Sequence, residues 1–266
     1  MNRIGGLFIA LTLLSAVFWV IESLFPANPR QLRFYRRRGF RIDLAYWFLT
    51  PLVTKSISQI GMAVILILLY RRNIHDIQTM LNARDTLLAR QALWLQAIEM
   101  VFVGDFVGYW THRWFHSCRM WAFHAIHHGS SELDWLSAAR VHPINDWLSR
   151  WIQASVVVVL GFSPVAIAAY LPFLTFYAIL LHANVSWGFG QLGRLIASPK
   201  FHRWHHTSED EGLDKNFAGL FPLFDILFGT YYMPEDRLPE RFGLNKDDAQ
   251  QTFWGQMISP FRTVGD

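Results

Sequence analysis

The chain has 266 residues, of which 52% are hydrophobic and only 17% are charged, and its net charge is +4. Because an ordinary globular domain carries about 25% charged residues, this composition favours a membrane protein over a soluble domain. The single cysteine, Cys118, excludes an internal disulfide and a metal site built from several thiolates.

The N-terminal part, residues 1–41, predicts a membrane anchor followed by an arginine-rich loop. Residues 4–21 carry no charge, and this run is too long for the apolar part of a signal peptide, so we expect a retained transmembrane helix. The arginines that follow predict a cytoplasmic loop near anionic headgroups. A nucleic-acid site is not expected, because no recognition module accompanies them. These arginines are Arg30, Arg33, Arg36, Arg37, Arg38 and Arg41.

A second apolar stretch covers residues 42–70, which is too long for one untilted span. It also contains Asp43, Lys55 and Gln59, so we expect a tilted or broken helix. After a polar connection, residues 92–110 predict a further span that continues directly into a histidine-rich region.

A last apolar stretch, residues 147–182, is interrupted around Gly161 and Pro164 and is short for two full spans. It predicts a helical hairpin that dips into the membrane, followed by a mostly soluble tail. Strand-like alternation is scarce, so the predicted fold is all-α, a single-domain polytopic membrane protein with about four transmembrane or membrane-dipping segments.

The histidines fall into three closely spaced groups. The first has the form H-x-x-x-H, and the other two have the form H-x-x-H-H, which places imidazoles on one face of a helix. Imidazole suits iron, zinc, copper and nickel, and eight such ligands suit two ions better than one. The eight predicted ligands are His112, His116, His124, His127, His128, His202, His205 and His206.

Local signals predict where these groups lie. His112 and His116 continue the helix of the third span, and Gly129 is a natural helix stop after His128. Ser198 followed by Pro199 predicts the start of a short helix that carries the last group. Asp105 precedes His112 by seven residues and shares its helix face. We expect its carboxylate to hold the N–H of a metal-bound imidazole; a buried pair with an arginine is the alternative.

These segments resemble the fatty acid hydroxylase and sterol desaturase superfamily over about residues 40–240. The matching stretches are 105–116, 123–128, 139–143, 182–184, 201–206, 215–219 and 224–231. The resemblance implies a catalytic core at about 92–240 and adds His182 as a ninth ligand, although Ala178 stands where other members often have a histidine. His142 is a ligand, a supporting group or a cap.

The resemblance also implies a membrane-bound oxygenase that hydroxylates or desaturates a lipid with O₂, using two iron ions, for which zinc can substitute in isolated protein, and no haem. No Rossmann glycine fingerprint is present, so electrons are expected from a ferredoxin, a cytochrome b5-like protein or a reductase. The histidine cap is expected to face the cytoplasm. One alternative, a zinc-dependent membrane hydrolase, lacks the expected His-Glu-x-x-His motif. The other, a non-enzymatic haem- or metal-binding protein, does not suit histidines clustered outside the spans.

Overall fold

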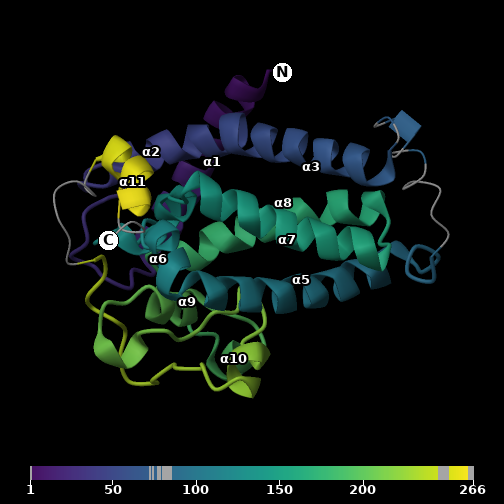
Figure 1. Ribbon diagram of the computed structural model, residues 1–266. Coiled ribbons are helices and arrows are strands. Elements are labelled where there is room, and N and C mark those ends of the chain that lie inside the picture. The colour runs from purple at the N-terminus through teal and green to yellow at the C-terminus, as the bar shows by residue number, and fades with distance from the viewer. Residues whose placement is uncertain are drawn as a thin grey trace.

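The computed structural model describes residues 2–71, 73, 75, 76, 79, 86–244 and 252–262 (Figure 1). Within these ranges the chain forms helices joined by turns, and no strand is formed. The prediction of an all-α fold is therefore confirmed.

Among the described residues, two helices are long and apolar enough to cross a membrane, Arg3–Leu24 and Phe40–Leu68. The first is α1, which begins where the Asn2 side chain accepts the N–H of Gly5. The second combines α2 (Phe40–Leu49) and α3 (Lys55–Tyr70) through a π-helical turn, Thr50–Thr54. Pro51 lacks an N–H and its ring crowds the preceding turn, which accounts for the widened turn. The stretch is therefore one helix with an irregular π-helical turn rather than a broken helix, and its tilt in a membrane stays a prediction.

Three more helices form a bundle beside α3: α5 (Leu93–Phe115), α7 (Pro143–Leu160) and α8 (Pro164–His182) (Figure 1). The predicted hairpin is formed by α7 and α8. Gly161 ends α7 with φ +84°, and the Ser163 side chain caps α8 by accepting the N–H of Ala166. That α5 crosses the membrane and that this hairpin dips into it stay predictions.

Shorter elements collect mainly at the end of the bundle where α5 and α8 terminate (Figure 1). The α-helices among them are α6 (Cys118–His124), α9 (Pro199–His205), α10 (Leu223–Leu227) and α11 (Phe253–Arg262). The 3₁₀ turns are η2 (His127–Gly129), η3 (Trp135–Ala139), η4 (Gly190–Arg194) and η5 (Asp210–Gly212).

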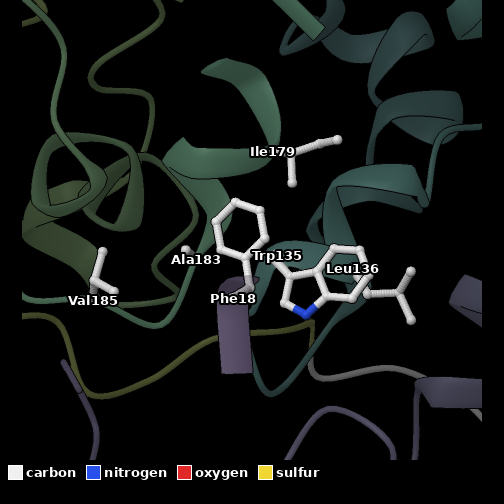
Figure 2. Close-up of a cluster of buried hydrophobic side chains, with 6 residues drawn as sticks. All are labelled: Phe18, Trp135, Leu136, Ile179, Ala183 and Val185. Carbon is white, nitrogen blue, oxygen red and sulfur yellow. The ribbon is translucent and has the colours of Figure 1, made fainter. Parts of the chain in front are cut away.

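A buried apolar cluster joins α1 to this end of the bundle. Figure 2 shows Phe18 of α1 against Trp135 of η3, with ring centroids 5.6 Å apart, and Ile179 of α8 nearby. The N-terminal helix is therefore packed against the segment that carries the histidines.

The arginine-rich loop differs from the prediction at one position. Arg37 is only 3% exposed and forms ion pairs with Asp43 and Asp134. Asp43 also pairs with Arg140, so four charged groups from separate segments offset one another inside the fold. The predicted contact with anionic headgroups is wrong for Arg37, because its guanidinium is buried and pairs with carboxylates of the protein instead.

Candidate metal centre

The structure brings all nine predicted histidines together, in two neighbouring groups. Within each group, one donor atom per residue lies within 4.8 Å of the others. The first group is His112, His116, His124, His128 and His205. The second group is His127, His182, His202 and His206.

Helix geometry accounts for most of these positions. His112 lies in the last turn of α5 and His116 caps that helix, so the two share one face. On α9, Ser198 accepts the N–H of Phe201 and Pro199 occupies the first turn, as predicted. The short helix is therefore confirmed, and it presents His205 to the first group and His202 to the second.

The segment around His124 differs from the prediction of one continuous helical face. The helix α6 ends at His124, the chain turns, and His127 and His128 lie on the 3₁₀ turn η2. The tightened backbone is held by an N–H···O bond of 3.2 Å from Gly129 to Ile126. This turn divides the motif, since His124 and His128 join the first group while His127 joins the second.

Hydrogen bonds fix the tautomers in the second group. The Nδ1–H of His127 donates to the Arg140 carbonyl at 3.0 Å, and that of His182 donates to the Ala178 carbonyl at 2.7 Å. A neutral imidazole has one proton, so the Nε2 atoms of both rings carry only lone pairs. These two atoms lie 3.1 Å apart. Two facing lone pairs repel each other, so this arrangement calls for a cation between them.

The first group repeats this pattern. His112 donates its Nδ1–H to the Phe217 carbonyl at 2.8 Å, and His124 donates to Asn145 Oδ1 at 2.7 Å. Their Nε2 atoms lie 3.0 Å apart. His205 donates its Nδ1–H to the Lys215 carbonyl, and its Nε2 is buried without a hydrogen-bond partner. Metal-binding histidines typically anchor their other nitrogen in this way.

The spacing of the bare nitrogens fits coordination of one ion by each group. In the second group, Nε2 of His202 lies 3.2 Å from that of His182 and 3.1 Å from that of His206. Nitrogens about 2.1 Å from one ion lie about 3.0–3.4 Å apart at octahedral or tetrahedral angles. Burial lowers the pKa of six of these imidazoles well below the ordinary value, which favours the neutral, metal-binding form. They are His124, His127, His128, His202, His205 and His206.

The predicted role of Asp105 is wrong. Its carboxylate accepts the backbone N–H groups of Gly219, Leu220 and Phe221, at 2.9, 2.8 and 2.6 Å. Within the described part of the chain, no hydrogen bond joins it to an imidazole. All three hydrogen bonds come from one loop, so the carboxylate holds the segment that follows Phe217 in place.

His142 lies outside both groups and acts as a helix cap. Its Nδ1 accepts the N–H of Ile144 at the start of α7. The structure thus favours the cap among the three roles considered for it. His75, which has no histidine neighbours in the sequence, is exposed.

Two side chains that orient imidazoles were not predicted. Asn145 accepts from His124, and Asp214 accepts the Nδ1–H of His116 at 2.9 Å. Asn145 lies three residues after His142 and just beyond the matching stretch 139–143, which is a weak signal. Asp214 gave no signal, because it follows other acidic residues in an exposed turn between two matching stretches, 201–206 and 215–219.

Comparison with known proteins decides the family. The profile described as fatty acid hydroxylase matches residues 97–230, a region that contains all nine histidines. The chain belongs to the fatty acid hydroxylase family. The match begins at the start of α5 and ends just after α10, so it covers both histidine groups and the loop held by Asp105.

Several known enzymes resemble the chain over part of their length. Alkylglycerol monooxygenases of Danio rerio and Homo sapiens are each 33% identical to it, over 52% of this chain and 31% of their own. The ornithine lipid hydroxylase of Rhizobium tropici is 28% identical, over 65% of this chain and 53% of its own. The matched region thus spans about a third to a half of these relatives. No solved structure matches the chain.

Proposed function

We propose that this chain is a membrane-bound di-iron oxygenase that hydroxylates a lipid with O₂ and externally supplied electrons. The observation that carries the proposal is the pair of imidazole groups whose bare Nε2 atoms face one another at 3.0–3.2 Å. A metal cation satisfies several lone pairs directed at one point, and two such points lie side by side in the fold.

The choice of iron rests on the chemistry of the substrate. Imidazole binds iron, zinc, copper and nickel, but zinc has no redox chemistry. An aliphatic C–H bond has no acidic proton, so acid–base groups alone cannot activate it. When bound, two irons would supply the activation of O₂ that this reaction needs. The names of the relatives, a monooxygenase of alkylglycerols and a hydroxylase of ornithine lipids, favour oxygen insertion over desaturation.

The protein's own contribution is orientation and a dry site. Backbone carbonyls of Arg140, Phe217 and Lys215 hold three imidazoles by Nδ1, so these rings cannot rotate away. The Phe217 ring lies 4.9 Å from that of His116 and limits the access of water to the first group. Oriented ligands in an apolar surround suit a reaction on a lipid chain.

The membrane placement is part of the proposal. With α1 and the α2–α3 pair crossing the bilayer, the arginine-rich loop between them would lie in the cytoplasm. Phe18 of α1 packs in one cluster with Trp135 and with Ala183, the residue after His182, which favours the same side for the metal centre. A lipid would enter sideways from the bilayer, and electrons would come from a cytoplasmic ferredoxin, cytochrome or reductase.

The test uses purified protein loaded with iron and supplied with membrane lipids, a reductant and isotopically labelled O₂. We expect a lipid product that carries one labelled oxygen, detected by mass spectrometry. His128→Ala should abolish the product, while His75→Ala, at an exposed position outside the centre, should not. An unlabelled product two hydrogens lighter would indicate desaturation. Turnover without O₂ would contradict the proposal in favour of a hydrolase.

A further inference from the structure

Two segments of the tail expose large apolar side chains, although the sequence predicted a mostly soluble tail. Leu192 and Leu195 in and after η4 are each 61% exposed, and Leu227 of α10 is 64% exposed. Ile196, Leu223, Ile226 and Phe228 are exposed as well. We call these seven side chains the tail face. A soluble surface seldom gathers so many large apolar groups in two short segments.

The two segments lie side by side. The backbone N–H of Ala197 donates to the Leu220 carbonyl at 2.8 Å, which joins the end of one segment to the start of the other. A cavity of about 260 Å³ opens between them and is lined by Arg194, Asp225, Ile226, Gly229 and Tyr231. The tail face is therefore one surface, and the cavity between its two segments is lined by the cationic Arg194 and by the carboxylate Asp225.

This surface continues the apolar sides of the bundle. Phe224 of α10 packs on Phe102 of α5 at 5.3 Å between ring centroids, and Phe228 packs on Trp110 at 4.8 Å. Phe102 and Trp110 are themselves exposed beside these contacts. Figure 1 shows α10 alongside α5 rather than at the end of the bundle with α6 and α11. On its other side, the Tyr177 hydroxyl of α8 donates to the Ala197 carbonyl.

Cationic and aromatic residues lie next to the leucines of the tail face. Arg194 and Tyr231 line the cavity, and Arg113 lies over the Trp110 ring at 5.6 Å from its centroid. Arginine beside tryptophan or tyrosine is typical of the level of the lipid headgroups. Another part of the tail is acidic and exposed, with Asp210, Glu211 and Asp214, so we expect that part to face water.

We propose that the tail face inserts into the lipid leaflet on the histidine side, with its leucines among the acyl chains and Arg194 at the phosphates. The inference rests on the proposed membrane location. It adds a second region of membrane contact, outside the predicted spans. Such insertion would hold the tail, and with it α9, against the bilayer. It would also bring lipid chains next to the loop at 217–221, whose Phe217 carbonyl orients His112.

The test places single cysteines in full-length protein reconstituted into bilayers of phosphatidylcholine and phosphatidylglycerol, after Cys118→Ser. A fluorophore is attached at Leu192→Cys or Leu227→Cys. Leu213→Cys is the matched control, since Leu213 is also an exposed tail leucine, at 49%, but lies in the acidic part. Leu13→Cys on α1, at 61%, reports the membrane location itself. Metal content identical to that of the starting protein shows that each variant is folded.

We expect labels at Leu192 and Leu227 to lose fluorescence to lipids brominated in their acyl chains, and the label at Leu213 to lose it only to iodide in water. Quenching at Leu192 and Leu227 by iodide alone, with Leu13 quenched by lipid, would overturn this inference and leave the membrane location intact. Iodide quenching at Leu13 would instead contradict the membrane location. In unaltered protein, a phospholipid with a photoreactive acyl chain should label residues 221–228 and not 209–214.

Discussion

The Arg140 carbonyl accepts the Nδ1–H of His127 at 3.0 Å, so the backbone at Arg140 fixes the orientation of an imidazole in the second group. The Arg140 side chain in turn pairs with Asp43 of α2, and Asp43 also binds Arg37. Asp134, which caps η3 just before Arg140, is the second partner of Arg37. A buried ion network therefore connects the second apolar helix to the metal centre.

The first prediction concerns this network. Asp43→Asn leaves Arg37 and Arg140 buried with one carboxylate fewer, and Asp43 itself is fully buried. Removing one partner of a buried ion pair costs about 3–5 kcal/mol, so the free energy of unfolding should fall by that amount. Unfolding of the purified protein in detergent, followed by circular dichroism, measures the change.

Asp146→Asn is the matched control. Asp146 pairs with Arg150 one helical turn away, and the arginine side chain is 42% exposed. Such an exposed pair contributes about 0.3–0.5 kcal/mol. Equal losses in the two variants would show that the buried network adds nothing to stability.

Contacts between residues close together in the sequence could be predicted, and contacts between residues far apart in the sequence could not. The histidine spacings and the Ser198 cap are local, so they indicated the donors and the start of α9. The partner of Asp105 lies 114–116 residues away, in a loop with no distinctive pattern, and it could not be inferred. Arg37 looked like its neighbours, because its burial depends on Asp134, a residue 97 positions away.

The division of the first H-x-x-H-H motif between the two histidine groups could not be predicted from the sequence either. Helical periodicity places His124, His127 and His128 on one face. The backbone tightens after His124 instead, and tertiary contacts rather than local preference determine this, since Ala125 and Ile126 are both buried. A second H-x-x-H-H motif on α9 is also shared between the groups, although it stays helical up to His205.

The second prediction concerns Asp105. Asp105→Ala orphans three backbone N–H groups, and each unsatisfied buried donor costs about 1–3 kcal/mol. Asp105→Asn keeps one acceptor oxygen and should lose less stability. If Asp105 acts on the loop and not on an imidazole, the asparagine variant should retain its full metal content. Metal analysis and thermal unfolding of both variants test this, and loss of metal from stably folded Asp105→Asn would restore the role first predicted.

The third prediction assigns one ion to each group. His205→Ala removes a donor from the first group and His182→Ala removes one from the second. Because losing even an outer partner of a ligand lowers affinity by about 10–100-fold, each variant should hold about one metal ion where the parent holds two. Elemental analysis after dialysis against a weak chelator gives the ratio of metal to protein.

Controls distinguish two independent sites from one shared site. The double variant should hold no metal, and His75→Ala, at an exposed position outside both groups, should match the parent. Loss of both ions in each single variant would show that the groups bind cooperatively. A parent that binds one ion when fully loaded would contradict the assignment of two sites.

The fourth prediction concerns the turn between α7 and α8, which sets where α8 delivers His182. Gly161 has φ +84°, and a Cβ there would lie 2.6 Å from Cγ2 of Thr86, whose hydroxyl donates to the Gly161 carbonyl. Gly161→Ala should therefore cost more than the about 1–2 kcal/mol of left-handed strain alone. Gly190→Ala is the matched control, since Gly190 has φ +54° and no atom within 4 Å of a Cβ.

Thr86→Ser separates the clash from the strain. Serine lacks the methyl group and keeps the hydroxyl, so it should recover part of the stability of Gly161→Ala while changing the parent little. Gly161→Ala, Thr86→Ser, the double variant and the parent form a double-mutant cycle, with thermal unfolding as the readout. A coupling energy near zero would mean that the turn relaxes around the added methyl, and that Thr86 does not constrain it. A positive coupling would show that this contact holds the end of α7 in place.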